Sequence, residues 1–335
     1  MIIHVNIPQN DYDVVLEKGA LKKVSEYFKL DRKVLIVTDD GVPSSYSKEI
    51  AAKCSEPFIV TLRQGEESKN LDNYALLLKE LCDNHFSRKD CVIAIGGGVI
   101  GDLAGFVAAS YMRGIDFYNI PTTSLSQIDS SIGGKTAIDF NGLKNIVGAF
   151  YQPKKVLIDT DVLKILSKRQ LNNGLVEALK MATTSNTSLF ELFENEDIYQ
   201  NIEKIIYEAI LIKKDVVEKD EKELGLRKVL NFGHTIGHGI EVNSDLLHGE
   251  AVAIGMLAMC DKDVKERLTK VLNKLDIKTK VDTNIDKVVE AISHDKKGEQ
   301  GFINCVYVDK IGSFEFIKLN MKEIKEKCEE IIHEK

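Results

Sequence analysis

The sequence predicts an α/β N-terminal domain with a mainly parallel sheet (1–158), followed by a mainly α-helical C-terminal domain (159–335). Three observations lead to this. The 335 residues exceed what one hydrophobic core usually serves. In the first part, short apolar runs alternate with amphipathic stretches. Beyond about residue 160, the apolar positions recur with helical spacing over longer segments.

The apolar runs of the first part have the length and β-branched composition of strands. They are Val34–Val37, Phe58–Leu62, Cys91–Ile95 and Phe117–Ile120. Helix-like segments such as Asn70–Cys82 separate the first three, which is the rhythm of a parallel sheet covered by helices. The opening Ile2–Ile7 and Tyr12–Leu16 are expected to form a separate antiparallel pair.

The second part has helical character almost throughout. The expected helices are Leu171–Phe193, Ile198–Glu218, Gly249–Cys260 and Met321–His333. One exception is Phe302–Phe316, where two β-rich runs flank the turn-like Asp309–Gly312 and predict a small hairpin.

Composition excludes several classes of protein. With 44% hydrophobic and 29% charged residues, the chain is neither disordered nor of low complexity. The net charge of −7 makes nucleic acid an unlikely partner. Without a long apolar stretch or a signal-peptide pattern we expect no membrane association and a cytoplasmic location. Six scattered cysteines without a CxxC pair predict reduced thiols, so any metal needs His, Asp or Glu ligands.

A glycine-rich turn follows the run Cys91–Ile95. Gly96, Gly98 and Gly101 form a GxGxxG pattern, which lets backbone N–H groups approach a pyrophosphate at a helix N-terminus. The acidic residue that usually follows about 20 positions later is absent, so this is not a standard Rossmann fingerprint. Asp39, at the end of an earlier strand, is a better partner for ribose hydroxyls. The alternative is a tight strand-to-helix turn without a ligand.

A dense set of polar side chains follows this turn. Asp129, Lys135, Lys144 and Asn145 are more than a solvated loop needs, although such a loop is the plain alternative. The P-loop spacing GxxxxGK[ST] is not met, because Asp129 stands where its first glycine should be. The sequence therefore disfavours ATP hydrolysis.

Histidines are concentrated in one short region. His234 and His238 lie one helical turn apart, and His248 follows, although the chain has only 7 histidines. By spacing alone, His234 and His238 form a ligand pair with His248 as the third; a three-His site and a His/His/Glu site remain open. Glu177 and Lys180 share a helix face, a pattern more often found as a surface ion pair. Imidazole and carboxylate ligands suit Zn²⁺ or Co²⁺.

Several long motifs resemble 3-dehydroquinate synthases, members of the sugar phosphate cyclase superfamily. The motifs are GGGVIGDLAGFVAASYMRG, IPTTSLSQIDSSIGGKTAID, NGLKNIVGAFYQP, GLVEALK, KKDVVEKDEKELGLRKVLNFGHTIGHGIE and LHGEAVAIGM, and the resemblance runs from about Val34 to Gly301. It implies an NAD-binding α/β domain, a helical metal- and substrate-binding domain, and an active site in the cleft between them.

The resemblance also implies a reaction. Enzymes of this family convert 3-deoxy-D-arabino-heptulosonate 7-phosphate, a phosphorylated sugar acid, to 3-dehydroquinate and phosphate in the shikimate pathway. NAD transiently oxidises C5, which acidifies the C6 proton. Phosphate elimination, reduction, ring opening and an intramolecular aldol reaction follow.

Residue by residue, the resemblance implies these roles. The metal ligands become Glu177, His234 and His248, which displaces His238 to the substrate phosphate. The phosphate would be bound by Lys135, Asn145, Asn231, His238 and one of Lys296 and Lys297. Asp129 and Lys180 would fix hydroxyls, and Lys213 and Arg227 would hold the carboxylate. The implied NAD-binding residues are Asp39, Glu66, Lys69, Gly97, Gly98, Asp102, Thr122, Thr123 and Lys144. Arg113 would reach the phosphate of a neighbouring subunit, which implies a homodimer.

Three rivals are weighed against this interpretation. Cyclases that make inososes or valiolones use substrates without a carboxylate, whereas Lys213, Arg227, Asn145 and His238 favour one that has it. An iron-type polyol dehydrogenase would share the layout and the metal histidines, but would not need the phosphate-binding set. A binding protein that has lost catalysis is disfavoured, since no matched catalytic position is substituted.

Overall fold

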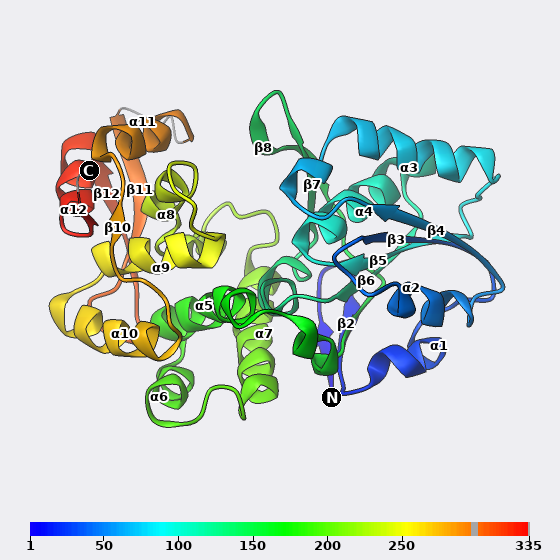
Figure 1. The fold of residues 1–335 in the computed structure, drawn as a ribbon, viewed down its shortest axis with the longest axis horizontal. Coiled ribbons are helices and arrows are strands. Elements are labelled where there is room, and N and C mark those ends of the chain that lie inside the picture. The colour runs from blue at the N-terminus through cyan, green and yellow to red at the C-terminus, as the bar shows by residue number, and fades with distance from the viewer. Residues whose placement is uncertain (296–300, 334–335) are drawn as a thin grey trace. The chain divides into compact units, whose positions relative to one another are not determined.

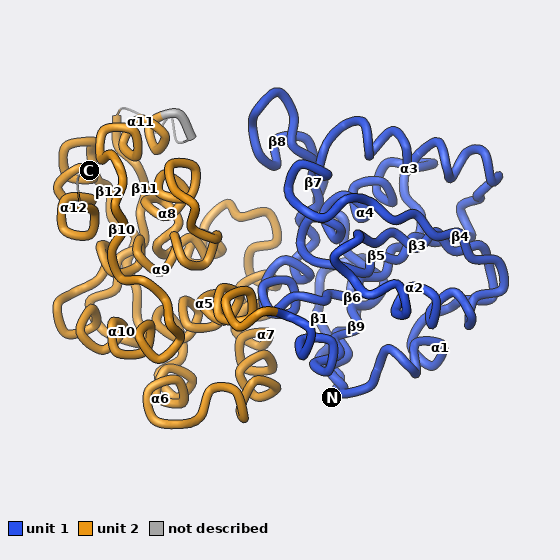
Figure 2. Tube along the Cα trace, in the orientation of Figure 1, with its two compact units in different colours: residues 1–166 blue, residues 167–335 orange. Residues whose placement is uncertain are grey.

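The computed structural model of the chain describes residues 1–295 and 301–333 and divides into two compact units, 1–166 and 167–335 (Figure 2). Unit 1 is an α/β unit and unit 2 is mainly helical (Figure 1). The fold class expected from the sequence is therefore confirmed. In the described part of the chain, no helix is long and apolar enough to cross a membrane.

A seven-stranded sheet forms the centre of unit 1. Its strand order is β1-β2-β9-β6-β5-β3-β4. Five of its strands, β9, β6, β5, β3 and β4, are parallel to one another, and β2 is parallel to β9. The bounds are β1 Ile2–Val5, β2 Tyr12–Leu16, β3 Lys33–Asp39, β4 Glu56–Leu62, β5 Cys91–Gly96, β6 Asp116–Pro121 and β9 Lys155–Ile158.

The expected antiparallel pair at the N-terminus exists but is not separate. β1 pairs antiparallel with β2, as predicted. However, β2 continues the main sheet through its parallel pairing with β9, a strand that the sequence analysis did not identify. The apolar Val14, Val15 and Leu16 of β2 are buried, as expected for a strand inside the sheet and not at its edge. Hydrophobic patterning gives strand identity but not strand partners.

Side chains alternate across the sheet and build two cores. Leu35 and Val37 of β3 pack on one face with α3 (Leu71–Asp83) and α4 (Gly98–Ser110). Val34 and Ile36 pack on the other face with α1 (Val24–Tyr27) and α2 (Ser44–Ala51). Successive side chains of a strand point to opposite faces of the sheet. Because helices cover both faces here, these runs are apolar at every position.

A hairpin of β7 (Lys135–Phe140) and β8 (Leu143–Phe150) extends from unit 1 (Figure 1). The sequence analysis did not predict it. Almost all of β8 is exposed, so burial imposes no alternation of apolar and polar residues on that strand. The hairpin carries three of the predicted site residues, Lys135, Lys144 and Asn145.

Unit 2 contains eight helices within its described residues: α5 Lys168–Ser185, α6 Thr187–Asn195, α7 Ile202–Lys219, α8 His234–Glu241, α9 His248–Ala258, α10 Lys262–Lys274, α11 Ile285–Asp295 and α12 Met321–Glu329. Two small strand pairs accompany them. β11 (Phe302–Tyr307) and β12 (Glu315–Asn320) form the predicted hairpin, and β10 (Val281–Asp282) pairs with β13 (Ile332–His333).

Two predicted helices of unit 2 differ from the structure. The segment Leu171–Phe193 is not one helix, because Asn186 leaves the helical conformation and its side chain accepts a hydrogen bond from Leu189 N, which begins α6. The segment Met321–His333 stops being helical at Glu329, and its last residues join β10 as a strand.

Candidate functional site

The glycine turn of unit 1 connects β5 directly to α4, as the sequence predicts. Gly97 is the N-cap of α4 and makes no side-chain capping hydrogen bond, which leaves backbone N–H groups at the helix N-terminus for an anion. A Cβ on Gly97 would lie 3.3 Å from Thr123 Cγ2, and one on Gly98 would lie 3.0 Å from Ser130 Oγ. Glycine at both positions therefore lets the backbone of this turn pack closely against the Thr123 and Ser130 side chains. This cradle suits the pyrophosphate of a dinucleotide.

Charged residues next to α4 form a compact network in unit 1. The Lys69 ammonium lies 2.6 Å from an Asp102 carboxylate oxygen and 3.7 Å from one of Glu66, and it donates to Asn145 Oδ1. Burial alone would lower the pKa of Lys69, but Asp102 and Glu66 outweigh it and raise the pKa. Three residues predicted to bind NAD and one predicted to bind phosphate are therefore in contact.

The backbone of Asn145 in β8 is held by Asp139 of the facing strand β7. Asp139 Oδ1 accepts from Asn145 N at 2.8 Å, and Asp139 N donates to Lys69 O at 2.8 Å. Asn145 has a φ of 56°, in the left-handed region that Asn tolerates better than most residues. The sequence analysis missed Asp139, which ties the hairpin to the loop that carries Lys69.

The remaining predicted residues of unit 1 lie at strand ends and turns. Asp39 ends β3, and burial raises the pKa of its carboxyl even though Gly41 N donates to it. Thr122 N donates to Gly96 O, which places Thr122 at the carboxyl end of β6 beside the glycine turn. Asp129 lies in a π-helical turn, Ser126–Ser130. This segment is mostly buried, so the solvated-loop alternative is wrong for Asp129, whereas Lys135, Lys144 and Asn145 are exposed on the β7–β8 hairpin.

Arg113 lies in the turn that follows α4 in unit 1. It is exposed, with a φ of 69°, in the short turn Tyr111–Arg113 after α4.

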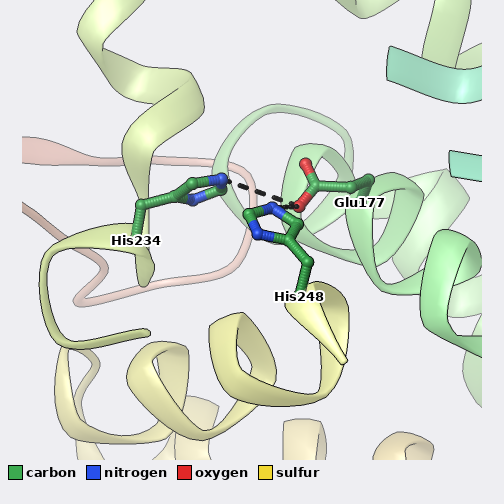
Figure 3. Close-up of side chains that lie close together, drawn as sticks. All are labelled: Glu177, His234 and His248. Carbon is green, nitrogen blue, oxygen red and sulfur yellow. Dashed lines mark ion pairs between the residues drawn. The ribbon is translucent and has the colours of Figure 1, made fainter. Parts of the chain in front are cut away.

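In unit 2, three helices bring Glu177, His234 and His248 together (Figure 3). Glu177 comes from α5, His234 begins α8 and His248 begins α9. Each histidine Nε2 lies 3.7 Å from Glu177 Oε1. One ligand atom from each of the three residues lies within 4.8 Å of the other two.

The environment of Glu177 is unusual for a carboxylate. Its side chain is 1% exposed, and neither oxygen has a hydrogen bond of acceptable geometry, although Lys180 Nζ lies 2.6 Å from Oε2. Burial alone would raise the pKa of Glu177, but Lys180 and the two histidines hold it well below its usual range. Glu177 and Lys180 are therefore a buried pair, which corrects the expectation of a surface ion pair.

The two histidines present the same ring nitrogen to Glu177. His234 Nδ1 lies 3.2 Å from the Phe232 carbonyl oxygen, and His248 Nδ1 lies 2.9 Å from Glu241 Oε2. Burial and Lys180 hold the pKa of His234 well below its usual range. Burial also disfavours charge on His248, but Glu177 and Glu241 outweigh it and raise its pKa to about 10.

This donor set fits a divalent metal. Two imidazole nitrogens and one carboxylate oxygen are the ligands of a catalytic Zn²⁺ or Co²⁺ site with an open position. In a tetrahedral site such ligand atoms lie roughly 3.4 Å apart, close to the 3.7 Å found here. The oxygens of Glu177, buried without hydrogen bonds, are the acceptors that an ion would satisfy.

His238 is near this cluster without belonging to it. Its ring lies 5.3 Å from that of His234 and 5.8 Å from that of His248. Its ligand atoms form a second possible group with Glu241 and His248. Within the described residues, no group contains His234 and His238 together, so the pair favoured by spacing alone is not the one that the fold assembles.

Other predicted residues of unit 2 lie in α5, in α7 and in the segment before α8. Lys180 Nζ also donates to Leu230 O, and Asn231 Nδ2 donates to Glu223 Oε1 at 2.6 Å. Lys213 in α7 and Arg227 in the 3-10 helix Leu226–Asn231 are both buried. Asn231 and Glu223 line a pocket of about 420 Å³. Lys296 and Lys297 lie outside the described residues.

Sequence reasoning missed Glu223 and Glu241. Glu241 is three positions after His238 on α8, so its helical spacing could have placed it on the histidine face. Glu223 lies in an irregular loop with a φ of 59° and carried no spacing signal.

Comparisons with known proteins identify the family of the chain. The 3-dehydroquinate synthase N-terminal family model matches residues 59–173, and the 3-dehydroquinate synthase C-terminal model matches residues 174–298. A 3-dehydroquinate synthase of Enterococcus faecalis is 39% identical over 97% of this chain and 98% of its own length.

Solved structures share the fold. A 2-deoxy-scyllo-inosose synthase complexed with carbaglucose-6-phosphate, NAD⁺ and Co²⁺ has a TM-score of 0.89 at 24% identity and covers 99% of this chain and 100% of its own. The 2-epi-5-epi-valiolone synthase ValA of Streptomyces hygroscopicus subsp. jinggangensis 5008, with NAD⁺ and Zn²⁺ bound, has a TM-score of 0.84 at 26% identity, covering 94% and 95%. Because both family models match in order and the identity extends over nearly the whole length, this chain belongs to the 3-dehydroquinate synthase family.

Proposed function

We propose that this protein catalyses the 3-dehydroquinate synthase reaction, the conversion of 3-deoxy-D-arabino-heptulosonate 7-phosphate to 3-dehydroquinate and phosphate, with NAD and Zn²⁺ or Co²⁺. The observation that carries the proposal is the convergence of Glu177, His234 and His248 from three helices in a chain of this family. When bound, NAD supplies reversible hydride acceptance, and the metal supplies a Lewis acid that acidifies a substrate hydroxyl.

Unit 1 would bind the dinucleotide at the start of α4. The N–H groups after Gly97 would bind an anion, and Asp39, at the end of β3, has a carboxylate suited to ribose hydroxyls. Lys69 connects Asp102 with Asn145, so the cofactor residues and a phosphate donor form one network. Glu66, Thr122, Thr123 and Lys144 complete the proposed set.

The substrate carries a phosphate and a carboxylate, so it needs cations gathered locally in a chain of net charge −7. Lys213 and Arg227 are buried cations of unit 2 and would hold the carboxylate. Lys135, Asn145, Asn231 and His238, with Lys296 or Lys297, would hold the phosphate. Asp129 and Lys180 would orient hydroxyl groups.

Proton transfer at C6 would need no further protein base. The leaving phosphate can accept this proton while Lys135, Asn145 and Asn231 hold it near the ring. The side chains thus position the substrate, and the later aldol step would proceed in the constrained product of elimination.

The proposal extends to assembly and location. Exposed Arg113 would reach the phosphate of a neighbouring subunit in a homodimer. We also propose a cytoplasmic location. All six cysteines, each within the described residues, are free thiols, which fits the reducing environment of that compartment.

One assay tests the function. The purified protein is incubated with the heptulosonate phosphate, catalytic NAD⁺ and Zn²⁺ or Co²⁺, and phosphate release and NADH absorbance are followed together. We expect phosphate release without net NADH. Stoichiometric NADH with a polyol would instead indicate a dehydrogenase, and turnover of glucose 6-phosphate in preference to the sugar acid would indicate an inosose-forming cyclase.

The His248→Ala variant tests the ligand assignment in the same assay. It should lose metal-dependent turnover, since one of three proposed ligands is gone, while circular dichroism shows a cooperative unfolding transition. Unchanged activity would refute the role of His248.

A further inference from the structure

Glu241 contacts the side of the His248 ring that faces away from Glu177. Its Oε2 lies 2.9 Å from His248 Nδ1, whereas Glu177 Oε1 lies 3.7 Å from His248 Nε2. The imidazole is therefore held between two carboxylates, one at each nitrogen. Glu241 is the last residue of α8 and His248 the first of α9, so the contact spans two helices.

The two histidines of the cluster differ in what fixes them. His234 has a side chain 12% exposed, with Nδ1 facing the Phe232 carbonyl. His248 is 28% exposed, so packing constrains its ring less, and the contact with Glu241 becomes the stronger restraint. A ring held at Nδ1 by an acceptor keeps its Nε2 lone pair available for an ion.

We propose that Glu241 is a positioning residue for the metal site: its carboxylate accepts the Nδ1–H of His248 and aims Nε2 at the ion held with Glu177 and His234. This deepens the proposed function, because it assumes that these three residues bind a divalent metal. Glu241 also adds negative charge behind the ligand, which strengthens imidazole as a donor.

A second geometry competes with this role. His238, Glu241 and His248 also offer ligand atoms within 4.8 Å of one another. Glu241 could then bind the ion directly through its carboxylate. The substitution Glu241→Gln separates the positioning role from direct metal binding. The Gln side chain still accepts the Nδ1–H hydrogen bond, but it is a poor ligand for Zn²⁺ or Co²⁺.

The test measures metal binding to the full-length protein without substrate. Metal-free wild type, Glu241→Gln and Glu241→Ala are titrated with Zn²⁺ against a chromophoric chelator, and with Co²⁺ while visible absorption is recorded. We expect Zn²⁺ to bind about 3–10-fold more weakly to Glu241→Gln and about 10–100-fold more weakly to Glu241→Ala. The shape of the Co²⁺ spectrum should be retained in Glu241→Gln, because the three ligands are unchanged.

Asp245→Asn is the matched control. It removes the same charge from an exposed position in the loop that leads to His248, and its zinc affinity should equal that of the wild type. If Glu241→Ala does not fold, Glu241→Gln decides alone: an affinity within twofold of the wild type overturns the proposal.

Two further outcomes would also overturn it. Equal losses in Glu241→Gln and Glu241→Ala with a changed Co²⁺ spectrum would make Glu241 a direct ligand. A wild-type protein that binds no Zn²⁺ or Co²⁺ would remove the basis of the inference. By contrast, a protein that binds metal but does not turn over the sugar acid would refute the proposed function and leave the role of Glu241 intact.

Discussion

The ionised carboxylate of Glu177 depends on the charged and polar side chains around it. An ionised carboxylate in a site that is 1% exposed requires nearby positive charge. Lys180 supplies it from one helical turn away on α5, and the His234 and His248 rings complete the surroundings. A bound metal ion would also compensate the negative charge of this carboxylate. A buried acid without hydrogen bonds therefore indicates a metal ligand more strongly than sequence spacing does.

Asp220 has a comparable organising role for the backbone near Arg227. Its carboxylate accepts hydrogen bonds from the N–H groups of Leu224, Gly225 and Arg227 at 2.7–2.9 Å. These bonds, led by the one from Arg227, lower the pKa of Asp220. They therefore stabilise the folded protein at pH values above about 3.9, the ordinary pKa of Asp. This stabilisation is lost as the pH falls through the lower pKa of Asp220 in the folded protein.

The Asp220→Asn variant should therefore show a pH-dependent defect. At pH 7 we expect a loss on the order of 1 kcal/mol in the free energy of unfolding, because a charged carboxylate that accepts three hydrogen bonds is replaced by a neutral amide with one acceptor oxygen. The difference from the wild type should shrink below about pH 4. Urea unfolding at both pH values measures it. Asp215→Asn, which removes an exposed partner of Lys219, should change little at either pH, and a defect of equal size at pH 7 and pH 3 would contradict the explanation.

Helices α8 and α9 carry two of the three proposed ligands and pack closely through glycines. A Cβ on Gly255 of α9 would lie 2.1 Å from Gly233 O, and one on Gly237 of α8 would lie 2.9 Å from Val252 Cα. Gly233 itself has a φ of 78°, in the left-handed region, immediately before His234. The close approach of the two helices thus depends on residues without side chains, and it sets the separation of His234 and His248.

Replacing Gly255 with Ala should force these helices apart. The added methyl group meets a backbone oxygen, which cannot rotate away as a side chain can. We expect a loss of about 1–3 kcal/mol in stability and weaker Zn²⁺ binding, measured by thermal unfolding and by chelator competition. NAD⁺ binding serves as the control, because its proposed residues lie in unit 1. Zinc affinity equal to that of the wild type would show that helix separation does not control the site.

The two units divide the chemistry between them. All proposed NAD residues lie in residues 1–166, and the three proposed metal ligands lie in residues 167–335. Each unit has its own core and its own charged network. The two binding events can therefore be tested separately.

Removing the metal should leave cofactor binding largely intact. After treatment with EDTA, we expect turnover to be lost while the dissociation constant for NAD⁺, measured by calorimetry, changes by less than about threefold. The reciprocal variant is Lys69→Met, which should weaken NAD⁺ binding because Asp102 loses its partner, but should not alter zinc affinity. Loss of NAD⁺ binding on metal removal would show that the two sites depend on each other.

Local patterns in the sequence predict six of the seven strands of the main sheet, most helices and the kinds of side chain that the chemistry needs. Apolar runs such as Cys91–Ile95 specify a buried strand locally, and the glycines after it specify the turn into α4, because both depend on neighbouring residues. The exposed β8 and the break at Asn186 escaped prediction, since the first has no buried face and the second depends on one hydrogen bond.

Which of these residues meet depends on how the helices pack. Spacing favoured His234 with His238, since it detects only contacts within one helix. The packing of α5, α8 and α9 instead groups His234 and His248 with Glu177, and adds Glu241 behind His248. Contacts between helices far apart in sequence depend on how their surfaces pack, and no local pattern in the chain records that packing.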